Sequence, residues 1–347
     1  MTYETNGDPS IALRRLVFGH RVTRLLGLAA ELNLADCLHK FQPCDALKLS
    51  KVVAAHPVAL NRVLRALVTI GVVAEDEFGR FVLTSMGICL RTSVPGSMKS
   101  WILSETSGYF QRAWEKLEFA VRTGKVAFNE AHQMSFYSYM EQHPDTARTF
   151  NETMADATRL IAKSVVEAYN FEGVDKVVDV GSGLGVLLIG ILEANPTLEG
   201  ILFDTSSVLA AARGRLSGAD VVTRCSFVEG DFFSAMRPNG NVYLLSRVIM
   251  DHDDEAASAI LSNCRNAMAP GGRILVIQPV LPSPGKIADD RTGPDAFMSD
   301  INMLVLERGL ERTEKQYSDL FRRAGLEVKC VIPTSSGVSI VEGVRRK

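Results

Sequence analysis

Acidic side chains and glycines recur where apolar segments end in the second half of this 347-residue sequence. Asp179, Gly181 and Gly183 belong to the segment VVDVGSGLG, Asp204 ends the segment ILFD, and Asp231 lies in GDFF. Glycine lets the backbone turn sharply and approach a ligand closely, and an acidic residue at the end of the following strand can accept the hydroxyl groups of a ribose. The pattern therefore predicts a nucleotide-type cofactor site.

The glycine loop distinguishes between two classes of cofactor. The dinucleotide fingerprint GxGxxG would need its third glycine at Val186, but this sequence has Gly185 one residue earlier. Asp179 precedes the first glycine by two residues, and its carboxylate would repel a pyrophosphate but attract an ammonium group. NAD is therefore disfavoured, and a cofactor with a cationic amino-acid end is favoured.

Two further side chains complete the expected cofactor site. The Asp231 carboxylate could accept a hydrogen bond from an exocyclic amine, and the Phe232 ring could cover the face of an adenine. Together with the glycine loop and the ribose acid, these groups predict S-adenosylmethionine as the cofactor. The expected cofactor-binding residues are Asp179, Gly181, Gly183, Asp204, Asp231, Phe232 and Ser246.

The elements that must position these residues alternate between strands and helices from Lys176 onward. The alternation predicts an α/β fold with a Rossmann-like, doubly wound parallel sheet, whose ligand crevice lies at the carboxyl ends of the strands. Strands are expected at residues 176–180, 200–203, 225–229, 242–246, 273–277 and 329–333, and helices at 186–194, 206–216, 255–268 and 314–324.

The first half of the chain is predicted to be mostly helical. Residues 11–33 carry apolar side chains at helical spacing, and such a helix often needs a partner surface, which favours a homodimer. From about residue 46 the pattern is a helix over 47–55, a helix over 58–70 and a hairpin of 72–75 and 80–84. This order is the outline of an N-terminal winged-helix domain.

Winged helices often bind DNA, so charge must decide between DNA binding and dimerisation. Residues 1–100 hold 12 Lys and Arg against 8 Asp and Glu, and the helix over 58–70 offers only Arg62 and Arg65. DNA affinity depends on cationic contacts with phosphates. The mild charge favours a dimerisation module without a nucleic-acid partner. A cofactor-sensing DNA-binding regulator remains the rival from another class.

Composition limits the remaining possibilities. The chain is 46% hydrophobic with a net charge of −2, which supplies a core but gives no electrostatic reason for an anionic partner. No run of 18 apolar residues, no signal-peptide pattern and six scattered cysteines predict a cytoplasmic protein with neither membrane span nor structural zinc. The length predicts a helical dimerisation and acceptor-cap domain over 1–165 and a cofactor-binding catalytic domain over 166–347.

Several segments resemble class I methyltransferases: DVGSGLG, FD at 203–204, GDFF at 230–233, SRVIMDHDDE at 246–255, MAPGGRILVI at 268–277 and GLERTEKQYSDLFRRAGL at 309–326. With the winged-helix outline, nearly the whole chain resembles the caffeate/hydroxyindole O-methyltransferase family in its bacterial form. The resemblance implies a homodimer, S-adenosylmethionine, and a small, often aromatic acceptor held between the helical cap and the Rossmann-like domain.

The sequence departs from this family at the catalytic positions. The resemblance implies a histidine base that is oriented by two glutamates, and the corresponding residues here are Met250, Gln278 and Glu311. A thioether cannot accept a proton at neutral pH. One glutamate is therefore kept and the base is missing, whereas every cofactor position remains.

Four explanations are open for the missing base. The favoured one is transfer to a thioether sulfur or an activated carbon, driven by proximity and desolvation without a base. The second is O-methylation with His252 or Asp251 as a relocated base. The third is other chemistry by a cofactor-binding relative, and the fourth is reaction of a phenol that is already ionised. The candidate catalytic residues are Glu311, His252 and Asp251.

The acceptor pocket is expected to be largely apolar, as small-molecule sites usually are. Its expected residues are Met250, Gln278, Met154, Met303, Trp114 and Phe128. Most of these side chains could equally fill the core. His252 could pack at a helix start, Asp251 could favour a helix dipole, and Glu311 with Arg312 could form a surface pair. No third ligand is spaced to complete a metal site at Asp251 and His252.

Overall fold

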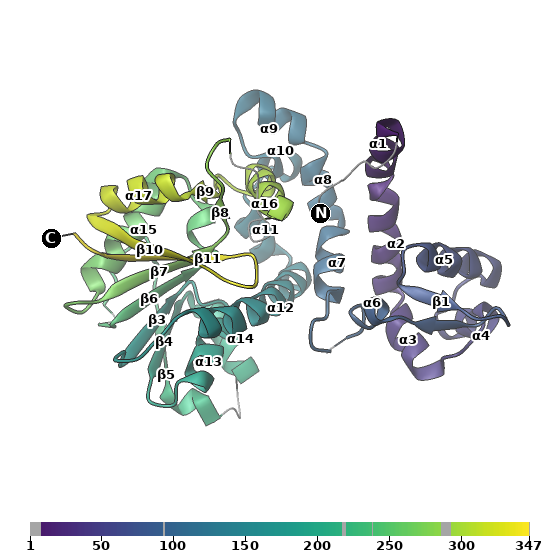
Figure 1. Cartoon of the computed structure of the whole chain (residues 1–347), viewed down its shortest axis with the longest axis horizontal. Coiled ribbons are helices and arrows are strands. Elements are labelled where there is room, and N and C mark those ends of the chain that lie inside the picture. The colour runs from purple at the N-terminus through teal and green to yellow at the C-terminus, as the bar shows by residue number, and fades with distance from the viewer. Residues whose placement is uncertain (1–7, 93, 217–219, 238, 286–292, 347) are drawn as a thin grey trace. The chain divides into compact units, whose positions relative to one another are not determined.

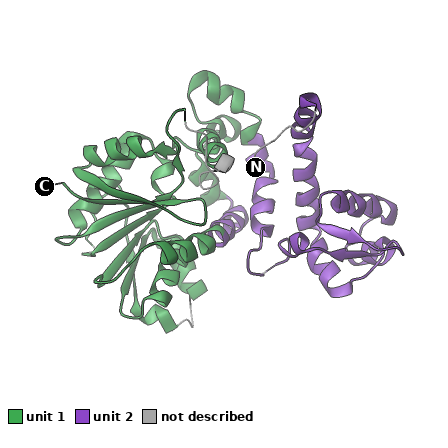
Figure 2. Ribbon diagram, viewed as in Figure 1, with its two compact units in different colours: residues 1, 113–142, 157–347 green, residues 2–112, 143–156 purple. Residues whose placement is uncertain are grey.

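The computed structural model describes residues 8–92, 94–216, 220–237, 239–285 and 293–346 (Figure 1). These residues form two compact units (Figure 2). The helical unit comprises the chain up to residue 112 together with 143–156, and the sheet unit comprises 113–142 and 157–347. The predicted boundary at residue 165 differs from this division because residues 113–142 pack within the sheet unit.

The helical unit begins with two helices, whereas the sequence predicted one helix over 11–33. Helix α1 (Pro9–Val17) ends at Phe18, and α2 (Gly19–Glu31) begins directly after it. Glycine has little preference for a helix interior, which explains an interruption at this point. The apolar residues of α1 are exposed within the unit: Ile11 43%, Leu13 63%, Leu16 45% and Val17 61%.

The rest of the helical unit contains the predicted winged helix. Its hairpin closes because the Asp76 carboxylate accepts the backbone N–H groups of Phe78 and Arg80 at 3.0 and 2.9 Å, while Gly79 adopts a φ of 72°. The elements are α3 (Leu34–Phe41), α4 (Ala46–Val52), α5 (Pro57–Thr69), β1 (Val73–Glu75), β2 (Phe81–Leu83), α6 (Ser85–Ile88) and α7 (Lys99–Glu105), with β1 and β2 antiparallel.

Seven strands of the described chain form the main sheet, in the order β10-β11-β7-β6-β3-β4-β5. Strand β3 (Lys176–Val180) pairs in parallel with β4 (Glu199–Asp204) on one side and β6 (Val242–Ser246) on the other. The strand order therefore reverses at β3, and ligands of doubly wound sheets bind at the carboxyl ends of the strands at such a point. The remaining strands are β5 (Cys225–Glu229), β7 (Arg273–Gln278), β10 (Leu326–Pro333) and β11 (Ser339–Arg345).

The α/β fold class is confirmed, but the sheet is not entirely parallel. Strand β11, which the sequence did not predict, pairs antiparallel with both β10 and β7. Residues 334–338 connect β10 to β11 directly, and so short a connection allows only an antiparallel pair. The strands expected at 176–180, 225–229 and 242–246 have the predicted bounds.

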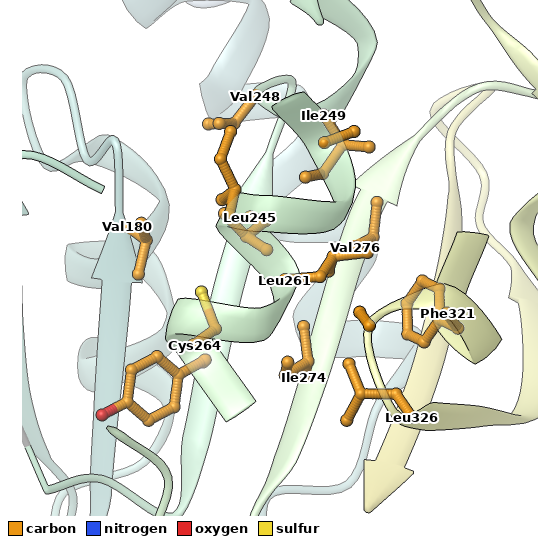
Figure 3. Close-up of a cluster of buried hydrophobic side chains, with 14 of the residues drawn as sticks. Val180, Leu245, Val248, Ile249, Leu261, Cys264, Ile274, Val276, Phe321 and Leu326 are labelled. Carbon is orange, nitrogen blue, oxygen red and sulfur yellow. The ribbon is translucent and has the colours of Figure 1, made fainter. Parts of the chain in front are cut away.

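Helices cover both faces of the sheet because its buried strands are apolar on both sides (Figure 1). Helices α15 (Asp254–Ala267) and α17 (Glu314–Arg323) pack on one face. Helices α13 (Val186–Ala194), α14 (Ser206–Leu216) and the second half of α12 (Pro144–Ala168) pack on the other. Figure 3 shows Leu261, Cys264 and Phe321 of the first layer against Ile274 and Val276 of β7.

The sheet unit also contains the short helices α9 (Leu117–Thr123), α10 (Ala127–His132) and α11 (Phe136–Gln142), besides α16 (Gly293–Leu306). A second, parallel pair of strands joins β8 (Val280–Leu281) to β9 (Arg312–Thr313). Within the part of the chain that is described, no single helix could span a membrane, and α4 and α5 satisfy the length and apolarity required only as a pair bent by 110°.

The core assignment predicts a large difference between two leucine truncations. Leu261 is completely buried, so Leu261→Ala should lower the free energy of unfolding by about 2–5 kcal/mol through lost burial and a residual cavity. Leu160 of α12 is 56% exposed, and Leu160→Ala should change it by about 0.5 kcal/mol or less. Urea unfolding measures both, and equal losses would contradict the assignment.

Candidate active site

The loop after β3 has the backbone that its glycines predict. Gly181, Gly183 and Gly185 have φ values of 70°, 54° and 77°, a region that favours glycine. A Cβ atom at Gly181 would lie 2.8 Å from a methyl group of Val248, and one at Gly185 would lie 2.8 Å from a methyl group of Leu202. Among the described residues, no heavy atom outside the adjoining residues lies within 4 Å of the Cβ position at Gly183, so the loop is open at its centre.

Two carboxyl groups flank this loop. Asp204 accepts the Gly183 N–H at 2.9 Å through one oxygen and the Thr205 N–H at 2.7 Å through the other. Asp179 is 2% exposed, and its Oδ2 has no hydrogen-bond partner among the described residues. Burial, together with the charge of Asp204, raises the pKa of Asp179 to about 7. An ammonium group beside Asp179 would reverse that effect by favouring its ionised form.

The third strand end lies beside the aromatic side chains of the expected adenine site. Asp231 is exposed and accepts the Phe233 N–H at 2.9 Å. The Phe232 ring lies 5.0 Å from that of Phe233 and 5.8 Å from that of His252, between ring centroids. His252 therefore packs on the aromatic side of the site, and burial lowers its pKa.

The turn after β6 carries the residue that replaces the expected base. Residues Ile249–Asp251 form one turn of 3₁₀ helix, in which Ile249 is fully buried and Met250 is 1% exposed. Figure 3 shows the Val248 and Ile249 side chains extending from this turn into the hydrophobic core. Burial of these side chains in the core therefore holds the turn in place.

Arg312 holds the same turn from the side. Its guanidinium is completely buried and donates to the carbonyl oxygens of Ile249 at 3.1 Å and His252 at 2.9 Å. It also forms an ion pair with Asp254 at 2.9 Å. The alternative of a surface pair between Glu311 and Arg312 is wrong, since Glu311 is 1% exposed and Arg312 is not exposed at all.

Gly309 allows the segment before β9 to approach this turn closely. A Cβ atom at Gly309 would lie 1.7 Å from the carbonyl oxygen of Met250 and 2.6 Å from the carbonyl carbon of Asp251. No other residue type fits there without moving the backbone. Residues 307–311 are consequently brought against the turn of Met250 and Asp251.

Three carboxyl groups meet at this contact. Burial raises the pKa of Asp251 to about 6, that of Glu307 to about 8 and that of Glu311 to about 7. The negative charge of Asp251 adds to burial at both glutamates. The Oε1 of Glu307 and the Oε2 of Glu311 are buried and have no hydrogen-bond partner among the described residues, while Ser299 donates to the other Glu311 oxygen at 2.8 Å.

Tyr137 of α11 contacts this acidic group, which the sequence analysis did not predict. Its hydroxyl donates to the Asp251 Oδ2 at 2.9 Å. The charge of Asp251, followed by burial of the hydroxyl, raises the pKa of Tyr137 well above its ordinary value. Tyr137 and Glu307 belong to no local sequence motif that would have indicated this contact.

Gln278 occupies the end of β7, where the family pattern has a glutamate. It is completely buried, its amide Nε2 donates to the Tyr317 hydroxyl, and its Oε1 has no partner among the described residues. Burial raises the pKa of Tyr317 above its ordinary value. The charge of Glu311 also raises the pKa of Tyr317, so a neutral amide at position 278 avoids adding another carboxylate to this region.

The other expected pocket residues are distributed over both units. Phe128 and Met303 of the sheet unit are 0% and 6% exposed, and Trp114 donates from its indole N–H to Asn302 at 3.2 Å. Met154 belongs to the helical unit. Trp114 is thus bonded to α16, the helix that carries Met303.

Comparison with known proteins identifies the family. A family model described as an O-methyltransferase domain matches residues 114–327, and one described as an O-methyltransferase dimerisation domain matches residues 14–93. The chain belongs to the O-methyltransferase family. It is 38% identical to the phenazine O-methyltransferase of Lysobacter antibioticus, over 96% of this chain and 95% of that protein.

Two further similar proteins are an N-methyltransferase and an O-methyltransferase whose structure contains bound ligands. This methyltransferase is 31% identical to the phenazine-1-carboxylate N-methyltransferase of Pseudomonas aeruginosa, over 92% of each chain. It also matches an O-methyltransferase from neocarzinostatin biosynthesis, solved with S-adenosylmethionine and 2-hydroxy-5-methyl naphthoic acid. That match has a TM-score of 0.77 at 28% identity and covers 94% of this chain and 96% of the other.

The chain is therefore an S-adenosylmethionine-dependent methyltransferase of small molecules. The strand ends fit the cofactor, because three of their buried polar atoms have no partner among the described residues: Asp179 Oδ2, Ser182 Oγ and Ser246 Oγ. The Asp179 oxygen can accept from the ammonium group of this cofactor. The two serine hydroxyls can bond to its carboxylate or its ribose.

Asp179→Asn should change how stability depends on pH. The folded pKa of about 7 exceeds the ordinary 3.8, so the folded chain binds this proton more tightly than the unfolded chain does. The stability associated with protonated Asp179 is intact below pH 4 and is lost as pH rises to 7.

In the cofactor-free protein, the variant should therefore gain roughly 3–4 kcal/mol relative to wild type between pH 4 and 8, because each unit of pKa difference corresponds to about 1.4 kcal/mol. Urea unfolding at each pH measures the difference, while calorimetric titration with S-adenosylmethionine should show weaker binding by the variant. A constant difference across the pH range would contradict a raised pKa at Asp179.

Arg312 and Arg323 both pair with Asp254, but removal of the buried Arg312 should lower the free energy of unfolding far more than removal of the exposed Arg323. Arg312→Met leaves the Ile249 and His252 carbonyl oxygens without their donor and should cost about 3–5 kcal/mol of unfolding free energy. Arg323 also pairs with Asp254, at 3.5 Å, but its side chain is 59% exposed, so Arg323→Ala should cost about 1 kcal/mol or less. Thermal and urea unfolding of the two variants test the contrast.

Proposed function

We propose that this methyltransferase methylates a hydroxyl oxygen of a planar aromatic acceptor and that Asp251 accepts the hydroxyl proton. The names of its relatives support an aromatic acceptor, since two of them are phenazine methyltransferases and a naphthoic acid occurs in a related complex. The observation that carries the proposal is the buried carboxyl of Asp251, next to Met250, in contact with Tyr137.

Asp251 suits the role of base better than His252. A general base works best when its pKa lies near or below the working pH, and a pKa of about 6 leaves Asp251 ionised at neutral pH. His252 packs against Phe232 and Phe233, on the side expected to hold adenine. Its backbone carbonyl is also bound by Arg312, which restricts the turn.

The cofactor supplies an electrophilic methyl group on a sulfonium. The protein then has three tasks: to hold the acceptor oxygen in line with that methyl group, to exclude water and to remove the proton. Asp251 takes the proton from the acceptor hydroxyl, so the acceptor does not have to ionise in solution before it binds. Glu311, fixed by Ser299, orients the acceptor by a hydrogen bond at its unpartnered oxygen.

Transfer to a sulfur or carbon acceptor without any base is the second candidate. The observation that favours it is Met250, whose thioether is buried at the position of the family's base. Such an acceptor needs only proximity and desolvation, and the carboxylates around Met250 would stabilise a cationic product. This candidate predicts that Asp251 is dispensable.

We also propose that the chain forms a homodimer through its first helices. Support comes from the exposed apolar side chains of α1 and from the dimerisation-domain match over residues 14–93. Large exposed apolar side chains that gather on one helix often mark a protein interface.

Asp251→Asn tests the proposed base directly. Wild-type kcat/KM should rise tenfold per pH unit below about 6 and level off above it, because the ionised carboxylate is the active form. Asp251→Asn should lose this rise and about 10²–10⁴-fold of activity at pH 7.5. The measurement is transfer of labelled methyl from S-adenosylmethionine to phenolic, amine, thioether and carbon acceptors, with pH profiles on the best acceptor.

Asp253→Asn is the matched control, because Asp253 caps α15 by accepting the Ala256 N–H at 3.0 Å and asparagine caps equally well. It should keep both rate and profile. Label in sulfur or carbon, with a flat profile from pH 5 to 9 and an active Asp251→Asn enzyme, would refute the Asp251 base and support the second candidate.

A further inference from the structure

The α11 helix brings one hydroxyl to the proposed base, and nothing in the family pattern accounts for it. We propose that Tyr137 is a positioning residue for methyl transfer: its hydroxyl holds the Asp251 carboxylate in the orientation and charge state that accept a proton. This inference rests on the proposed function, because it assigns Tyr137 a role that acts through Asp251.

The geometry leaves one carboxylate oxygen for the acceptor. The Tyr137 hydroxyl donates to Oδ2 of Asp251 at 2.9 Å, and no other described side chain donates to either oxygen. Gly309 lets the segment before β9 lie against the backbone of Met250 and Asp251, which holds the backbone that carries the carboxylate. Oδ1 is consequently the oxygen that can receive the acceptor proton.

The tyrosine itself is anchored in a way that suits this task. Its neighbour Phe136 is 3% exposed and packs edge-on against it, with ring centroids 5.5 Å apart at 84°. Phe136 in turn packs edge-on against the fully buried Phe128 of α10 at 5.4 Å. The Tyr137 ring remains 50% exposed, so burial of the ring does not explain where it is held.

The charges around the pair explain why one added donor matters. Burial raises the pKa of Asp251 to about 6, while the Tyr137 hydrogen bond and the Arg247 charge oppose this rise. Glu307 and Glu311, which face Asp251 from the segment around Gly309, have pKa values raised to about 8 and 7.

Asp204 is the remaining charged group that acts on Tyr137, and it disfavours loss of the phenolic proton. Tyr137 therefore stays a donor across the working pH range. With that donor, Asp251 is the carboxyl group that ionises first and Glu307 keeps its proton. Without it, the two groups would compete for the proton near neutral pH.

Tyr137→Phe removes the hydroxyl and keeps the ring. The rising limb of the kcat/KM profile should move up by roughly one pH unit, since a hydrogen bond to a carboxylate favours its ionised form by about this amount. At pH 6 the variant should be about fivefold slower than wild type, at pH 5 about tenfold slower, and at pH 8.5 it should be within about twofold of it. The assay is labelled methyl transfer to the acceptor identified for the wild-type enzyme.

Tyr139→Phe is the control, because it removes a hydroxyl from the same helix and should leave the limb where it is. In an Asp251→Asn background, Tyr137→Phe should have no further effect on kcat/KM.

An unshifted limb in Tyr137→Phe, or an equal loss at every pH, would overturn the inference while leaving Asp251 as base. Absence of any limb in the wild type, together with an active Asp251→Asn enzyme, would instead overturn the proposed function. The two failures are therefore distinguishable.

Discussion

The buried guanidinium of Arg312 is the constraint on which the active-site region depends. A guanidinium cannot lose its proton in a protein, so once it is completely buried its donors must all be satisfied. The Asp254 carboxylate and the carbonyl oxygens of Leu310, Ile249 and His252 accept from it. The turn between Ile249 and His252 is thereby fixed. Thr313, the next residue, caps α17 with a reciprocal bond to Gln316. Arg312 is therefore also fixed relative to α17, which packs on the sheet.

A fixed turn explains how carboxyl groups can collect beside Met250. Asp251 is held by Tyr137, and Gly309 brings the segment of Glu307 and Glu311 against it. Burial then spreads their pKa values from about 6 to about 8, so that neighbouring carboxyl groups differ in protonation at one pH. Such a separation is how one kind of side chain supplies both a proton acceptor and a hydrogen-bond donor.

Several strands and helices around the glycine loop were predictable because each is a short apolar segment that begins or ends at a glycine or a helix-capping residue. The strands at 176–180, 225–229 and 242–246 and the helices at 186–194 and 206–216 have their predicted bounds. Strand β11 was missed, since its pairing depends on a hairpin with β10 and on the antiparallel partner β7. The break at Phe18 was missed because apolar spacing continues across it and outweighs a single glycine.

The sequence by itself determined the fold class and the cofactor, because motifs at successive strand ends keep their order in any doubly wound sheet. Only the tertiary structure decided which side chains surround Met250. Tyr137 lies 114 residues from Asp251 along the chain, and Glu307 and Arg312 follow it by more than fifty. Contacts over such separations depend on how α11, the turn after β6 and the segment before β9 pack together. Burial sets the charge states of the carboxyl groups, and burial is a property of the folded chain alone.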